Sequence, residues 1–172
     1  MDQLRAVAQV SKRTAYQHFT GKDDLVAAYL RRFDPDIMAG VFDRTDLTPR
    51  EQLLAAFEVS ASGPEELTPL CPCIAATVEV HDPQHPASRY ARDYKLAIAV
   101  RLAEAAREAE ATNPEQLGEQ LALLLEGASA RTRVLNAESF PTAAAIAAVL
   151  IDDALPAADR DRGSEKSAVG SG

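Results

Sequence analysis

The sequence contains few of the residues on which several protein classes depend. It has no tryptophan, and only 5% of its 172 residues are aromatic, whereas 47% are hydrophobic. Because alanine and leucine dominate that hydrophobic fraction, the composition is typical of a helical bundle and argues against a β-sandwich or β-barrel. Two cysteines are too few to form a disulfide framework in a chain of this size.

Long hydrophobic runs are also missing. The longest, Ala143 to Ile151, has nine residues, and a membrane helix needs roughly 20. Nothing in the sequence resembles a signal peptide, so we expect a cytoplasmic protein that has no membrane partner. The sequence also lacks a glycine-rich phosphate loop and a Ser/His/Asp arrangement at a recognisable turn. We therefore expect neither enzymatic activity nor a cofactor.

The charge is unevenly distributed along the chain. The formal net charge is −8, yet residues 1–33 carry six basic and three acidic groups, whereas the remainder carries 12 basic and 23 acidic groups. A basic segment attached to an acidic body indicates contact with a polyanion through the N-terminal part alone.

Capping residues and hydrophobic spacing predict an all-α fold. Ser11 is a suitable N-cap for a helix over 12–19, and Thr20 to Asp23 resembles the capping box of the next helix. Thr48-Pro-Arg-Glu51 and Asn113-Pro-Glu-Gln116 predict two further helix starts. The remaining expected helices are 3–8, 74–80, 87–109 and one from Pro141 to about Leu155. The expected domains are a head over 1–33, a helical body over 34–155 and a disordered tail over 156–172.

The stretch from Val10 to Lys22 is typical of the recognition half of a DNA-binding helix-turn-helix. Such a motif places its second helix in the major groove while neighbouring groups grip the phosphates. Basic and polar groups in this stretch suit that task, whereas Ala15 and Phe19 fall on the inward face. The candidate DNA-binding residues are Lys12, Arg13, Thr14, Tyr16, Gln17, His18 and Lys22.

The sequence Ala8-Gln-Val-Ser-Lys-Arg-Thr-Ala-Tyr-Gln-His-Phe-Thr-Gly-Lys22 resembles the signature of the TetR/AcrR family of transcriptional regulators, A-G-V-S-K-x-T-x-Y-x-H-F-x-x-K. The resemblance implies a helix-turn-helix head followed by an antiparallel helical bundle, with Tyr16 on the DNA backbone. Gln9 replaces the family's turn glycine, and we expect it in a left-handed conformation that costs about 1–2 kcal/mol. The family places a complete helix before this motif, and we expect an upstream reading frame that encodes one. The alternative is a poorly ordered head.

The last two expected helices carry apolar residues on two faces, which predicts burial on two sides. The resemblance implies that these helices form a four-helix interface between two copies of the chain. A second stripe on the first of them comprises Leu123, Ala130 and Val134, and the alternative is that both stripes are internal core. The predicted homodimer interface comprises Leu117, Leu121, Leu124, Ala128, Ile146 and Leu150.

Leu70-Cys-Pro-Cys-Ile74 and Asp82-Pro-Gln-His-Pro86 resemble a TetR-like subgroup that carries a Cys-Pro motif and this histidine loop. A mostly apolar effector pocket is expected nearby, although its candidate residues are equally typical of ordinary core. These candidates are Phe57, Cys73, Thr77, Tyr90 and Tyr94. A weak zinc candidate comprises Cys71, Cys73, His81 and His85, but its C-x-C spacing is tighter than usual. A redox-sensing pair of thiols is a further alternative.

Together these patterns predict a ligand-responsive transcriptional repressor. We expect it to bind a palindromic operator in double-stranded DNA as a homodimer, through the recognition helix over 12–19, and to respond to a small-molecule effector. The alternative is a dimeric helical protein that binds a ligand or metal and does not bind DNA as written.

Overall fold

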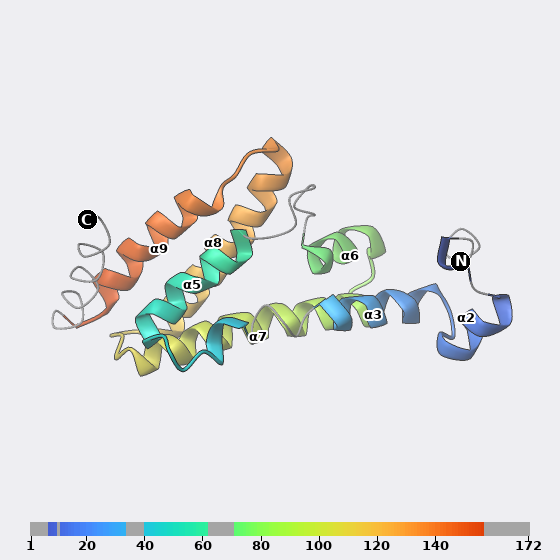
Figure 1. Cartoon of the computed structure of the whole chain (residues 1–172), viewed down its shortest axis with the longest axis horizontal. Helices are drawn as coiled ribbons and strands as arrows, with labels where there is room; N and C mark the ends of the chain where they lie inside the picture. Colours follow the sequence, from blue (N-terminus) through green and yellow to red (C-terminus); the bar gives the residue numbers. More distant parts are fainter. Residues whose placement is uncertain (1–6, 10, 34–39, 62–70, 157–172) are drawn as a thin grey trace. The chain divides into compact units, whose positions relative to one another are not determined.

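The computed structural model describes residues 7–9, 11–33, 40–61 and 71–156, and every regular element in these ranges is helical (Figure 1). The predicted all-α fold is therefore confirmed. Only Val7 and Ala8 of the expected first helix are described, and the predicted tail beyond Pro156 lies outside the described residues. The helices are α2 (Lys12–His18), α3 (Lys22–Phe33), α5 (Pro49–Ala61), α6 (Pro72–Val80), α7 (Pro86–Glu108), α8 (Pro114–Leu135) and α9 (Phe140–Ala154).

The chain divides into two compact units. One comprises Met1–Pro35 with Cys71–Tyr94, and the other comprises Asp36–Leu70 with Lys95–Gly172. The predicted head over 1–33 falls within the first unit, which also contains α6 and the first part of α7. The physical reason is a small hydrophobic cluster that α3, α6 and α7 share, formed by Leu30, Cys73, Ala76, Ala87 and Ala91.

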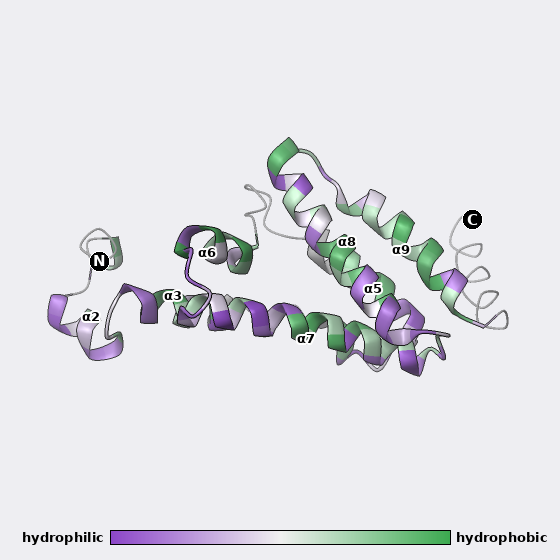
Figure 2. Cartoon of the chain, turned by 180° about the vertical axis from the view of Figure 1, so that it is seen from behind, coloured by the Kyte–Doolittle hydropathy of each residue, from purple (hydrophilic) through white to green (hydrophobic). Residues whose placement is uncertain are grey.

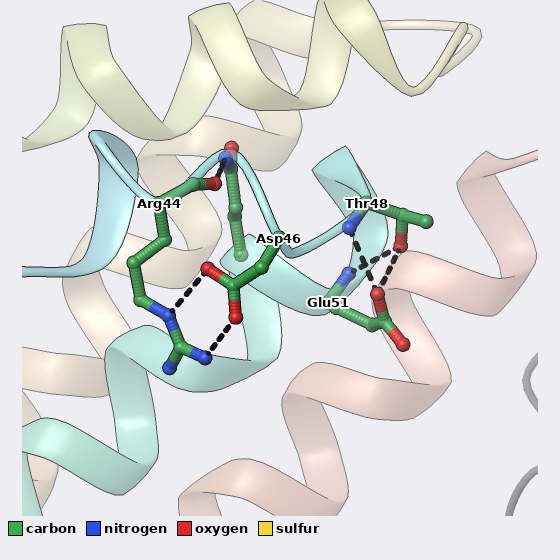
Figure 3. Close-up of polar contacts among 5 residues, drawn as sticks. Arg44, Asp46, Thr48 and Glu51 are labelled. Atoms are coloured by element: carbon green, nitrogen blue, oxygen red, sulfur yellow. Dashed lines mark hydrogen bonds and ion pairs between the residues drawn. The ribbon is translucent and has the colours of Figure 1, made fainter.

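The predicted helix starts are formed by side-chain caps. The Ser11 hydroxyl accepts a hydrogen bond from the Thr14 amide at 3.0 Å, and the Asn113 side chain accepts one from the Gln116 amide at 3.3 Å. At the start of α5, the Glu51 carboxylate accepts from the Thr48 amide at 2.8 Å, as Figure 3 shows. Each cap satisfies a backbone N–H that has no partner within its helix, which confirms these three predictions.

The loop before α5 is held by further polar contacts (Figure 3). The Arg44 guanidinium donates to both carboxylate oxygens of Asp46, at 3.1 and 2.5 Å. These hydrogen bonds lower the pKa of the Asp46 carboxyl below its ordinary value. The Gln52 side-chain amide also donates to the Arg44 carbonyl at 2.8 Å. The loop therefore enters α5 in a defined conformation.

The larger unit is built around a core that α5, α7, α8 and α9 share. Figure 1 shows α5 and α8 alongside α9, and both helices contact α9 directly. The largest fully buried side chains in this unit include Leu53, Phe57, Leu102, Leu121 and Ile151. Gly118 of α8 lies directly against α7, because a Cβ atom there would meet the Ala103 nitrogen and the Ala99 carbonyl oxygen at 2.8 Å.

The structure separates the two apolar stripes of α8. Of the predicted dimer-interface residues, Leu117, Leu121 and Ala128 are buried in the core of a single chain. Leu124 and Leu150 are partly buried against the same core. The other stripe is open, since Leu123 is 71% exposed and Val134 is 80% exposed. In the part of the chain that is described, the hydrophobic surface of the last two helices includes Leu123, Val134, Ile146 and Val149.

Helix α9 is apolar on more than one side, but only one side is buried in the single chain. Figure 2 shows hydrophobic residues along most of this helix and hydrophilic ones near its C-terminal end. Its inner face contributes Ala143, Ala147 and Ile151 to the core, whereas Val149 is 68% exposed. No helix in the described ranges combines the length and the apolar character needed to cross a membrane.

The C-terminal end of α7 offers a test of backbone strain. Glu110 has a φ of 61°, its amide donates to the Arg107 carbonyl, and the Ala111 amide donates to the Ala106 carbonyl. This Schellman motif favours glycine at the left-handed position. We expect Glu110→Gly to raise the free energy of unfolding by about 1 kcal/mol, measured by urea denaturation. Asn136→Gly, at the equivalent position after α8 with φ of 48°, is expected to gain less because asparagine tolerates this conformation. Equal gains at both positions would contradict the strain argument.

Candidate nucleic-acid interface

Helix α2 is a short helix with one buried face. The Ser11 cap begins it, and the Phe19 amide ends it by donating to the Ala15 carbonyl at 3.0 Å. Ala15 is the only buried residue of α2, and Phe19 after it is partly buried. The inward face predicted from the four-residue spacing of Ala15 and Phe19 is therefore confirmed.

The structure places the seven candidate DNA-binding side chains at the surface of α2 and the first residue of α3. Tyr16 remains 47% exposed, and the Lys12 ammonium group lies 5.9 Å from the centre of its ring. The exposed residues are Lys12, Arg13, Thr14, Tyr16, Gln17, His18 and Lys22. Three of these residues are basic at neutral pH, so the surface can attract a polyanion as well as hydrogen-bond to one.

The turn between α2 and α3 is held by one carboxylate. The Asp24 side chain accepts a hydrogen bond from the Thr20 amide at 3.1 Å. The sequence suggested a capping box that ends at Asp23, but the Leu25 amide donates to the Gly21 carbonyl, so the helix begins at Lys22 and the register moves by one residue. Asp23 is therefore not the capping residue of α3, and its carboxylate lies beside His85 instead.

The turn before α2 contains the predicted left-handed residue. Gln9 has a φ of 53°, which confirms that glutamine adopts the conformation for which the family signature uses glycine. A side chain with a Cβ atom is strained in this region because Cβ approaches the following carbonyl oxygen.

The five candidate effector-pocket residues do not come together within one compact unit. Phe57 belongs to the core of the larger unit and is almost completely buried. Cys73 is buried in the smaller cluster, and Tyr90 and Tyr94 pack against that cluster. Thr77 is exposed, and its hydroxyl donates to the Ile74 carbonyl of its own helix at 2.8 Å. Phe57 therefore has a core position, and an effector pocket near the other four residues remains a prediction.

The zinc candidate is not assembled. In the ranges that the structure describes, no group of three or more histidine, cysteine, aspartate or glutamate side chains could hold a metal ion. The His81 Nδ1 atom lies 3.0 Å from the Glu79 carbonyl oxygen, and the His85 Nδ1 atom accepts from the Ala87 amide at 3.1 Å. His81 and His85 therefore each have a backbone partner within this loop. Burial of Cys73 also argues against a redox-sensing pair, since reactive thiols are partly exposed.

His85 has a structural role that the sequence patterns did not predict. It precedes Pro86, the first residue of α7, and its ring accepts from the Ala87 amide in the way that an N-cap side chain does. Its other ring nitrogen, Nε2, lies 3.4 Å from the Asp23 carboxylate of α3. The histidine-proline pair of the loop was a usable signal for a helix start, but no pattern indicated the partner on α3.

Neither the protein-family models nor the curated proteins compared with the sequence gave a match. Two solved structures are similar. A protein from Streptomyces avermitilis, described as a putative TetR transcriptional regulator, is 33% identical, with a TM-score of 0.73 over 90% of this chain and 86% of its own. A TetR-family transcriptional regulator from Streptomyces coelicolor is 25% identical, with a TM-score of 0.75 over 89% of this chain and 81% of its own. With this identity and coverage, and with its helix-turn-helix, the chain belongs to the TetR family of transcriptional regulators.

Proposed function

We propose that the protein is a ligand-responsive repressor that binds a palindromic operator as a homodimer through α2. The observation that carries the proposal is the surface of α2. Its polar and basic side chains are exposed, while Ala15 anchors the opposite face. A short helix with this division can enter the major groove, where Gln17 and His18 are suited to read base edges.

Dimerisation is proposed to use the open stripe of the last two helices, which we call the outer face. It comprises Leu123, Ala130 and Val134 of α8 with Ile146 and Val149 of α9. Four of these five side chains are large hydrophobic groups at least 46% exposed in a single chain. Burying them against a second copy would remove apolar surface from water and bring two copies of α2 to one DNA duplex. Such a two-fold dimer would suit two half-sites about one helical turn, roughly 34 Å, apart.

The effector is proposed to bind beside the cluster of α3, α6 and α7. Tyr90 and Tyr94 are partly buried there next to Cys73, and aromatic side chains of this kind suit a mostly apolar ligand with one or two polar groups. A ligand at this position would act on the unit that contains α2 and α3, because these helices and the cluster belong to the same compact unit. Phe57 has no part in this proposal.

A selection experiment tests the proposed operator binding. The purified protein is incubated with a pool of random DNA duplexes, and the bound fraction is amplified and sequenced over several rounds. We expect an enriched palindrome with two half-sites about one helical turn apart. Enrichment of no sequence would contradict operator binding, and enrichment of a single half-site would contradict the dimeric mode.

Two substitutions are expected to separate base contacts from phosphate contacts. Gln17→Ala should relax the preference at one operator position, with a loss of about 1–3 kcal/mol against the selected base. Lys22→Ala should weaken binding to all sequences alike and reduce the slope of log K against log salt by about one. Fluorescence anisotropy with the selected duplex and single-base variants, at several salt concentrations, measures both effects. Identical behaviour of the two variants would contradict the assigned contacts.

A further inference from the structure

We propose that His85 is a positioning residue that couples the start of α7 to the start of α3 and thereby sets operator affinity without touching DNA. The imidazole lies between the N-terminal ends of two helices. Its side chain is 14% exposed, and its Nε2 atom lies 3.4 Å from the Asp23 carboxylate oxygen. All these residues belong to one compact unit.

The two ring nitrogens of His85 have different partners. The Nδ1 atom accepts the Ala87 amide hydrogen at 3.1 Å, which caps α7. An accepting nitrogen carries no proton, so the other ring nitrogen, Nε2, is the one that lies beside the Asp23 carboxylate. One side chain therefore caps α7 and contacts the first turn of α3 at the same time.

The loop before α7 holds the ring in this place. The Asp82 side chain accepts from the Gln84 amide at 2.9 Å, and the Asp82 carbonyl accepts from the His85 amide at 3.2 Å. The Arg89 amide then donates to the His85 carbonyl at 3.0 Å. These bonds give a physical reason for the Asp82-Pro-Gln-His-Pro86 pattern: aspartate closes the turn, and histidine caps the helix that the second proline begins.

On the other side of the contact lies the DNA-binding motif. Asp23 follows Lys22, a proposed phosphate contact, and precedes Asp24, which holds the turn after α2 through the Thr20 amide. A displacement of the first residues of α7 would therefore also displace the turn that orients α2. Asp23 itself is 71% exposed, so we expect a modest coupling, at the low end of the usual range.

Two substitutions test the Nδ1 cap and the Nε2 contact of His85 separately. His85→Asn retains an oxygen acceptor in the position of Nδ1 and lacks any group in the position of Nε2. His85→Gln carries an amide group near the position of Nε2 and lacks the cap. For His85→Asn we expect a nearly unchanged melting temperature and about a fivefold loss of affinity for the selected operator. For His85→Gln we expect a lower melting temperature and an affinity within about twofold of the wild type.

A double-mutant cycle with Asp23→Ala gives the decisive measurement. Removing an exposed carboxylate beside DNA would by charge alone strengthen binding, whereas the coupling predicts that Asp23→Ala weakens it about as much as His85→Asn does. The double variant should bind no more weakly than either single variant, because both remove the same contact. Additive losses, or tighter binding by Asp23→Ala, would overturn the inference.

The inference rests on the proposed operator binding, and a second measurement keeps the two apart. Hydrogen exchange of the DNA-free protein reports on the residues from 19 to 25 directly. We expect faster exchange there in His85→Asn than in the wild type, with exchange in α8 and α9 unchanged. If the wild type selects no operator but this exchange increases, operator binding fails and the coupling between the starts of α7 and α3 stands. If exchange is unchanged, the coupling fails whether or not DNA binds.

Discussion

Gly118→Ala is expected to lower the free energy of unfolding by about 3 kcal/mol, the upper end of typical overpacking costs. A Cβ atom at this position would lie 2.8 Å from the Ala103 nitrogen and from the Ala99 carbonyl oxygen, and 2.9 Å from the Ala103 Cβ atom. Two of these three atoms are backbone, so no rotamer change relieves the contact, and α7 and α8 have to move apart. Thermal and urea denaturation measure the loss.

Gly127→Ala is the matched control in the same helix. A Cβ atom there has no neighbour within 4 Å, and alanine is favoured over glycine inside a helix by about 1 kcal/mol. This variant should therefore be more stable than the wild type. Because Gly127 lies on α8 near the proposed dimer surface, light scattering should accompany the measurement. Similar effects of the two substitutions would contradict the close approach of α7 and α8.

Replacing Leu123 and Val149 together by glutamate is expected to give a folded monomer and to lower operator affinity more than about 100-fold. Both side chains are largely exposed in the single chain, so the fold has little to lose from the substitutions. In the dimer they would place four carboxylates in an apolar interface, where charges without partners are costly. A monomer binds only one half-site. It therefore loses the high effective concentration that the second recognition helix of a dimer has once the first is bound.

Val78→Glu is the control for this experiment, since Val78 of α6 is 62% exposed and lies outside the outer face. It should remain dimeric and bind the selected operator normally. Light scattering gives the mass, circular dichroism the helix content, and fluorescence anisotropy the affinity. A double glutamate variant that remains dimeric would show that the outer face is not the interface. A monomer that retains full affinity would contradict the palindromic mode of binding.

Local features of the structure were predictable from sequence because neighbouring residues produce them. The caps at Ser11, Thr48 and Asn113 depend on contacts three residues apart, and the left-handed Gln9 depends on its place in one turn. The motif from Ala8 to Lys22 also indicated the TetR family, which comparison with a similar solved structure confirms. Short-range chemistry of this kind is independent of how the rest of the chain packs.

Which of the two apolar stripes of α8 is buried could not be predicted from the sequence. Leu121 and Leu123 are both leucines on an apolar helix, and periodicity alone assigns each to a buried face. Packing against α7 and α9 distinguishes them, because Leu121 is fully buried whereas Leu123 is open. Phe57 is a similar case. Its hydrophobic side chain is compatible with an effector pocket and with a core, and only packing shows that it lies in the core.

By itself, the sequence determined the helical composition, the positions of the main caps and the identity of the DNA-binding motif. Only the tertiary structure decided which apolar stripe is already covered, which histidine faces Asp23, and that α6 and the start of α7 belong with the motif. These features depend on residues distant in the chain, and a periodic pattern specifies a face but not the partner that covers it. The sequence named the second stripe of α8 and His85, but the exposure of the stripe and the contact of His85 with Asp23 became known only once the chain was folded.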